Sequence, residues 1–136
     1  MRLELTRRGD YAVRAMLALT AAGDDGWTSS PRIAASMAIP ARFLPRVLRD
    51  LARAGLVAAH PGRSGGYRLA RSADTISLLD VIDAVEPPDP VPRCVLRGIP
   101  CGTDGRCQVH DVFDAARVAH RSRLGDATLA SIAPPA

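Results

Sequence analysis

Residues 41–54 read ARFLPRVLRDLARA, and they carry more information about the fold than any other segment of the chain. Successive residues of an α-helix advance by about 100° around its axis, so the four arginines of this segment fall within about 60° of one another. These arginines are Arg42, Arg46, Arg49 and Arg53. The apolar side chains fall on the opposite face: Leu44, Val47, Leu48 and Leu51. The pattern predicts an amphipathic helix with one face on a core and a row of guanidinium groups on the other. Gly55 is a typical residue to end it, and Pro45 predicts an irregular first turn.

A second short helix is expected immediately before this segment. Ser29 or Ser30 followed by Pro31 is typical of an N-cap with proline in the first turn, and the helix extends to about Ser36. Residues 37–39 then leave room only for a tight connection. Two short helices joined by a brief turn predict a helix-turn-helix with residues 41–54 as its second helix.

The flanking segments extend this motif. Residues 11–22 have helical apolar spacing between Thr6, a plausible N-cap, and Gly23. After the helix-turn-helix, the strand-like runs 56–59 and 67–69 flank the loop HPGRSGG (60–66), which predicts a β-hairpin and hence a winged helix. We expect a further helix at 78–85, capped by Ser77, and a long helix at about 109–124. The predicted fold class is mainly α with a small β-hairpin, divided into a winged helix-turn-helix (1–86), a cysteine loop (87–108) and a long C-terminal helix with its tail (109–136).

Length and composition limit the possible classes of protein. The 136 residues suffice for one domain, and 47% hydrophobic with 24% charged residues is typical of a globular chain. No apolar run is long enough to span a bilayer, and the N-terminus lacks the pattern of a signal peptide. We therefore expect a cytoplasmic protein without a membrane partner.

Charge is distributed unevenly along the chain. Residues 1–70 hold 11 arginines and 5 acidic residues, whereas residues 71–136 hold 7 arginines and 9 acidic residues. The basic N-terminal half favours a polyanionic partner. A solvated surface is the commoner reason for a row of charges on a helix. Here the row has only Asp50 beside it and occupies the second position of a helix-turn-helix, which favours a recognition helix in the major groove of DNA.

The predicted hairpin adds a second candidate contact with DNA. Arg63 lies near its tip and is expected to enter a minor groove, although an exposed arginine on a turn is the simpler alternative. The neighbouring glycines permit close approach to another surface. The predicted DNA-binding residues are Ser29, Arg42, Arg46, Arg49, Arg53, Arg63, Gly65 and Gly66.

Three cysteines gather in the proline- and glycine-rich loop. Six residues separate Cys94 from Cys101, and five separate Cys101 from Cys107. Structural zinc sites usually contain a closer cysteine pair, whereas wide spacing suits a loop around an iron–sulfur cluster. A zinc site of three cysteines and His110, and a set of incidental thiols, remain open. The fourth ligand of a cluster could be His110, an exogenous group or a residue of another subunit.

Taken together, these segments resemble the Rrf2 family of bacterial regulators. The resemblance rests on MRLELTRRGDYAVRAMLAL (1–19), IPARFLPRVLRDLARAGLV (39–57), GRSGGYRLARSADTISLLDVIDAVE (62–86), the three cysteines and the long final helix. It implies a winged-helix homodimer that binds palindromic promoter DNA and pairs through its C-terminal helix. It also implies a [2Fe–2S] or [4Fe–4S] cluster held by Cys94, Cys101 and Cys107.

Two branches of the family differ in the fourth cluster ligand, and this chain matches both. His110 matches a histidine three residues after the last cysteine, while Asp10 matches an aspartate that the partner subunit supplies. The first interval between cysteines is one residue longer than in either branch.

The leading hypothesis is a cluster-sensing, DNA-binding transcription regulator, a repressor that responds to nitric oxide, redox state or iron supply. The alternative is a zinc-binding or metal-free thiol-switch regulator of the same fold. A small redox enzyme or electron carrier is disfavoured because neither function requires a row of arginines suited to DNA. We therefore expect no enzymatic activity.

Overall fold

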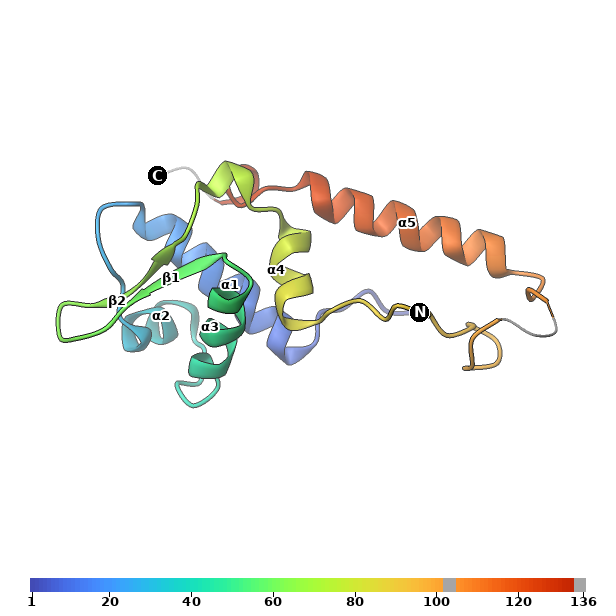
Figure 1. The fold of residues 1–136 in the computed structure, drawn as a ribbon, viewed down its shortest axis with the longest axis horizontal. Coiled ribbons are helices and arrows are strands. Elements are labelled where there is room, and N and C mark those ends of the chain that lie inside the picture. The colour runs from blue at the N-terminus through green and yellow to red at the C-terminus, as the bar shows by residue number, and fades with distance from the viewer. Residues whose placement is uncertain (102–104, 134–136) are drawn as a thin grey trace.

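The structure is a computed structural model that describes residues 1–101 and 105–133. Its elements are α1 (Arg7–Ala22), α2 (Ser30–Met37), α3 (Leu44–Arg53), β1 (Val57–His60), β2 (Gly66–Leu69), the 3-10 helix η1 (Ala73–Thr75), α4 (Leu78–Val85), α5 (His110–Asp126) and α6 (Leu129–Ile132). The predicted fold class is confirmed, since the chain is mainly helical with one antiparallel hairpin. Figure 1 shows the hairpin at one end of the molecule and α5 extending away from the helical body toward the other end.

The core lies where α1 meets α3 and α4. Side chains from these three helices are almost completely shielded from solvent, among them Met16, Leu19, Leu44, Leu48, Leu51 and Val81. The apolar face predicted for residues 44–51 is therefore confirmed. Burying a leucine side chain contributes about 1.5–3 kcal/mol, so this small cluster supplies much of the stability of the body.

The ends of the helices follow from local hydrogen bonding. Thr6 and Ser29 cap α1 and α2, as predicted, by accepting hydrogen bonds from the backbone N–H groups of Gly9 and Arg32. Ser77 and Asp80 form a reciprocal capping box at the start of α4. The end of α4 in turn holds the start of α1, because the Glu86 carboxylate accepts a 2.9 Å hydrogen bond from the N–H of Thr6. These caps account for the agreement between predicted and observed boundaries.

The start of α3 differs from the prediction. The helix begins at Leu44 rather than near residue 41, and a turn closed by a 3.0 Å bond from the Phe43 N–H to the Pro40 carbonyl precedes it. Pro45 is the physical reason, because its ring would collide with the carbonyl of residue 41 in a continuous helix, whereas proline is well tolerated in a first turn. The placement of Arg42 on the helical row was therefore wrong, since Arg42 lies in the turn.

The wing consists of β1 and β2, with Val57 opposite Leu69 and His60 opposite Gly66. Thr28 adds a short third partner by pairing with Tyr67 through two 2.8 Å backbone hydrogen bonds. A side chain at Gly66 would collide with the Thr28 carbonyl, and Gly66 also adopts a φ of 147°. Gly66 is thus required by its close approach to Thr28 of the same chain, while the approach of the hairpin glycines to another surface stays a prediction.

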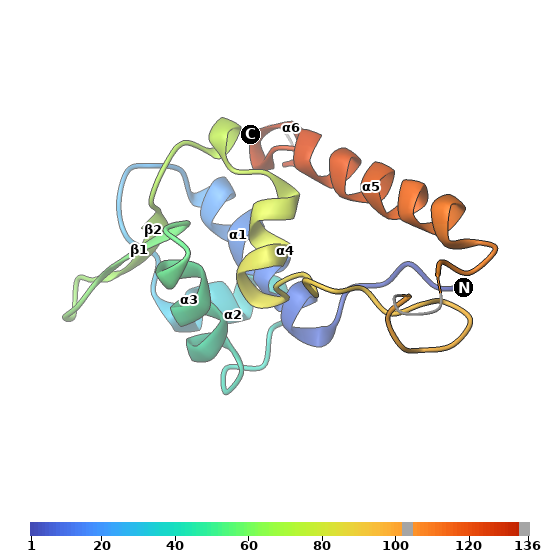
Figure 2. The same ribbon diagram turned by 45° about the vertical axis from the view of Figure 1, so that its right-hand side comes forward.

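The C-terminal part contrasts with this body. Helix α5 has no buried residue, and it is joined to α4 by paired hydrogen bonds of 3.1 and 2.7 Å from Arg121 to Asp83. Figure 2 shows α5 and the cysteine loop on the side of the body away from the wing. This placement separates the two regions to which the sequence assigned function.

Candidate nucleic-acid interface and metal centre

The exposed face of α3 carries three arginines that we call the arginine face: Arg46, Arg49 and Arg53. Among the described residues, none of them lies within ion-pair distance of a carboxylate. The nearest acid along the helix, Asp50, is bound instead by Arg8 of α1 at 2.7 Å. The arginine face is thus left with uncompensated positive charge, which is the electrostatic pattern that attracts DNA phosphates.

The wing and the start of α2 form a second part of this surface. Ser29, Arg63, Gly65 and Gly66 line one open groove of about 410 Å³. Arg63 is exposed, and Ser29 uses its hydroxyl to cap α2, as its bond to the Arg32 N–H shows. The structure therefore brings the predicted wing residues and Ser29 together, although their contact with DNA stays a prediction.

Side chains of the wing pack against Trp27, which precedes α2 in the chain. The guanidinium of Arg68 lies 4.2 Å from the ring centre of Trp27, and the ring of His60 lies 5.0 Å from that of Trp27. A cation over an aromatic ring is favourable by about 0.5–1 kcal/mol at an exposed site. These contacts fix the direction in which the hairpin leaves the body.

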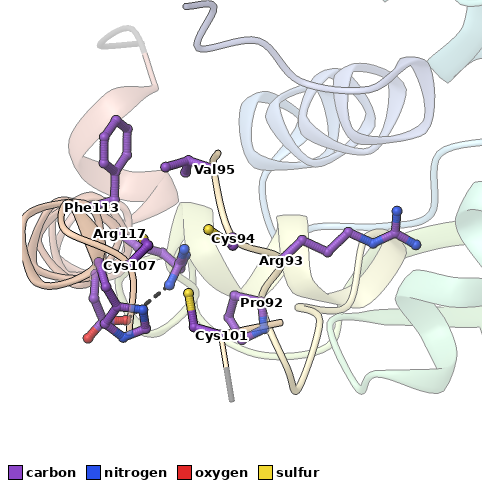
Figure 3. A pocket seen from close by; sticks show the side chains of 10 residues that line it. Pro92, Arg93, Cys94, Val95, Cys101, Cys107, Phe113 and Arg117 are labelled. Carbon is purple, nitrogen blue, oxygen red and sulfur yellow. Dashed lines mark hydrogen bonds and ion pairs between the residues drawn. The ribbon is translucent and has the colours of Figure 1, made fainter. Parts of the chain in front are cut away.

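The cysteine site consists of Cys94, Cys101 and Cys107, whose sulfur atoms all lie within 4.8 Å of one another. Figure 3 shows the three side chains gathered beside Phe113 and Arg117 of α5. Two backbone hydrogen bonds close the first turn of the loop, from the Cys94 N–H to the Ile99 carbonyl (2.8 Å) and from the Gly98 N–H to the Cys94 carbonyl (2.9 Å). The loop therefore supplies the three sulfur atoms, and the first turns of α5 line one side of the site.

The surroundings of the site favour a thiolate at Cys94. Hydrogen bonds from the backbone N–H groups of Leu96 and Arg97 lower the pKa of the Cys94 thiol to about 6, although the side chain is only 7% exposed. Desolvation, together with the neighbouring Cys94 sulfur, raises the pKa of Cys107. The Arg97 guanidinium also lies 4.0 Å from the Cys101 sulfur. A cysteine binds a metal ion or cluster as the thiolate, and N–H groups directed at sulfur are typical of such sites.

The two candidates for a fourth ligand occupy different places. His110 begins α5 and lines the small pocket of the cysteine site, about 70 Å³ in volume. Asp10 lies on α1, where its carboxylate accepts a 2.8 Å hydrogen bond from Arg14. Within residues 1–101 and 105–133, the group of potential ligands comprises the three cysteines alone. The site therefore fits a cofactor held by three thiolates, with its remaining ligand contributed by another group.

Comparison with known proteins assigns the chain to a family. Residues 5–135 match the model of the Rrf2 family, described as iron-dependent transcriptional regulators. The chain belongs to the Rrf2 family. An HTH-type transcriptional regulator of Mycobacterium tuberculosis, Rv1287, is 34% identical over 131 residues, which cover 96% of this chain and 81% of that protein. The protein rrf2 of Nitratidesulfovibrio vulgaris is 28% identical over 96% of this chain and 87% of its own length.

Solved structures share the same architecture. CymR of B. subtilis, the global cysteine regulator, superposes with a TM-score of 0.82 at 28% identity and covers 97% of both chains. IscR of T. potens has a TM-score of 0.75 at 26% identity over 96% of this chain and 85% of its own. The predicted winged-helix fold is thereby confirmed.

Membership of the Rrf2 family confirms the coarser functional prediction. This chain is a DNA-binding transcription regulator, and its relatives are regulators rather than enzymes. No helix in the described part of the chain is both long and apolar enough to cross a membrane.

Sequence reasoning overlooked two arginines of this Rrf2 regulator. Arg97 contacts the cysteine site, and the only signal in the sequence is its position between two cysteines. Arg7 lines a pocket with Arg42 and Arg46, and no periodicity relates it to them because it belongs to a different helix.

Proposed function

We propose that this Rrf2 regulator is a homodimer that represses transcription and senses its signal through an iron–sulfur cluster on Cys94, Cys101 and Cys107. The observation that carries the proposal is the gathering of three sulfur atoms within 4.8 Å in a loop that directs N–H groups at Cys94. A bound cluster would supply a redox-active and nitric-oxide-reactive centre. His110 is the candidate fourth ligand from the same chain, and Asp10 is the candidate from the partner subunit.

The dimer is proposed from the apolar side chains of the C-terminal helix. Val112 and Val118 of α5 are 70% and 62% exposed, and no residue of α5 is buried within its own chain. A second copy packed along α5 would remove these side chains from water. The two recognition helices would then contact half-sites about one helical turn of DNA apart.

Contacts within the chain support coupling between the cysteine site and DNA. Cys107 lies just before α5, α5 is joined to α4 by Arg121 and Asp83, and α4 packs against α1 and α3. Ordering or releasing the cysteine loop would shift α5 and thereby the spacing of the arginine faces in the dimer. A small change in that spacing alters affinity for a palindromic site.

Anaerobic purification tests this proposal, with an absorption spectrum and iron and sulfide analysis on the same sample. We expect a brown protein with iron and sulfide in equal amounts, and a Cys101→Ser variant without the absorption. The iron content per chain then distinguishes a [2Fe–2S] from a [4Fe–4S] cluster. A colourless wild-type protein that binds DNA would refute the cluster but not the DNA-binding function.

A zinc-binding or metal-free thiol switch is the second candidate. His110 lines the same pocket as the three cysteines and would complete a zinc site of three thiolates and one imidazole. The lowered pKa of Cys94 favours a reactive thiolate, which a thiol switch requires. Zinc in stoichiometric amount would indicate a structural metal site. Three titratable thiols without metal, together with DNA affinity that changes on oxidation, would indicate a thiol switch.

A further inference from the structure

A pocket of about 280 Å³ lies between the first turn of α1 and the start of α3. It is lined by four arginines and three apolar or aromatic residues: Arg7, Arg8, Arg42, Arg46, Tyr11, Phe43 and Val47. Arg46 belongs to both this pocket and the arginine face. The pocket therefore opens beside the surface proposed to bind the major groove.

The four arginines differ in whether their charge is compensated. Arg8 forms a 2.7 Å ion pair with Asp50. Among residues 1–101 and 105–133, no carboxylate lies within ion-pair distance of Arg7, Arg42 or Arg46. Three free guanidinium groups at one small pocket repel one another, so the site favours an anion.

The remaining walls are two aromatic rings and one valine side chain. The rings of Tyr11 and Phe43 stack with centres 5.8 Å apart, and the Arg42 guanidinium lies 4.7 Å from the ring centre of Phe43. Val47 is buried and anchors this end of α3 to the core. The pocket thus combines an apolar surface with three free cations, which matches the chemistry of a sugar joined to a phosphate.

We propose that this pocket binds one sugar–phosphate unit of the DNA backbone, with Arg7 as a DNA contact contributed by α1. The inference rests on the proposed docking of α3 in the major groove, because that docking brings a backbone strand past the start of the helix. Arg7 and Arg42 then bind the phosphate from two sides, and the deoxyribose packs on Phe43. The contact reads no base, so it adds affinity to any sequence and fixes the position of α3.

The salt dependence of DNA binding tests the proposal. Affinity of the purified full-length protein for a duplex of arbitrary sequence is measured at several KCl concentrations for the wild type, Arg7→Ala and Arg7→Lys. Losing one phosphate contact lowers the slope of log affinity against log salt by about 0.9 per protomer. We therefore expect this decrease for Arg7→Ala and a wild-type slope for Arg7→Lys.

A matched control removes the same charge elsewhere. Arg123 is exposed on α5, and Arg123→Ala is expected to keep the wild-type slope. Circular dichroism of each variant establishes that the fold is intact. If Arg46→Ala lowers the slope and Arg7→Ala does not, the assignment of this pocket as a sugar–phosphate site is wrong. If neither variant changes the slope, the proposed docking of α3 fails as well.

Discussion

The winged-helix body and the C-terminal arm of this Rrf2 regulator are built in different ways. The arm comprises the cysteine loop and α5, residues 87–126. In the body, α1, α3 and α4 enclose a core whose leucines are shielded from water, while α5 of the arm buries no residue of its own. The body therefore has the contacts to fold as a single chain. The arm keeps apolar side chains such as Val112 and Val118 exposed, and the proposed dimer and cofactor would supply the contacts that its own chain does not.

The two regions also differ in whether their arginines form ion pairs with carboxylates. The arginine face of the body has no carboxylate partner among the described residues, whereas Arg106, Arg117 and Arg121 of the arm each bind an aspartate. The uncompensated charge supports the proposed docking of the arginine face on DNA. The Arg121–Asp83 pair instead joins α5 to α4 of the body.

The largest effect is expected from replacing both Arg46 and Arg49 by alanine. Each arginine contact with DNA contributes about 1–3 kcal/mol, so the double variant should lose most of its affinity in a fluorescence-anisotropy titration. The side chains are exposed, so the thermal unfolding of the protein and its metal content should not change. Retained affinity would show that the body binds DNA through another surface.

Core and arm substitutions sharpen the contrast in stability. Leu48→Ala leaves a cavity in the body and should lower the free energy of unfolding by about 2–5 kcal/mol in urea denaturation.

Val112→Asp on α5 should instead convert the proposed dimer to a folded monomer, as measured by analytical ultracentrifugation. A Val112→Asp protein that stays dimeric would exclude this face of α5 from the interface.

Removing one ligand is expected to affect the arm alone. Cys94→Ser should abolish iron binding, because it removes the thiolate whose pKa is lowered by the backbone N–H groups of Leu96 and Arg97. The far-UV circular dichroism spectrum of the variant should match that of the wild type, because the helices of the body do not depend on this ligand. Iron retained at the wild-type level would contradict the assignment of Cys94 as a ligand.

The smallest effect is expected at Arg97, which contacts the cysteine site without being a ligand. Its positive charge stabilises the more negative, reduced state of a bound centre, so Arg97→Gln should lower the reduction potential. Arg106→Gln is the control, because Arg106 lies in the same loop but binds Asp111 at 3.1 Å. Equal potentials for both variants would show that Arg97 does not tune the site.

The local signals in the sequence predicted the helices well. Thr6 and Ser77 were recognised as caps, and Ser29 as one of two candidates, because their hydroxyl groups satisfy the first backbone N–H groups of a helix, which is a local interaction. The start of α3 was misplaced because Pro45 was expected only to make the first turn irregular, whereas it excludes residues 41–43 from the helix. The cysteines were recognised from their residue type, but their convergence depends on loop contacts.

The order of helices and strands, the apolar face of α3 and the arginine face follow from the sequence alone, because each depends on residues a few positions apart. Tertiary structure alone determines which arginines stay free, since Arg8 reaches Asp50 from another helix while Arg7 beside it does not. It also brings Arg7 to Arg42 and Arg97 to Cys101. Charge compensation depends on distances in space, and these are set only when the core has packed.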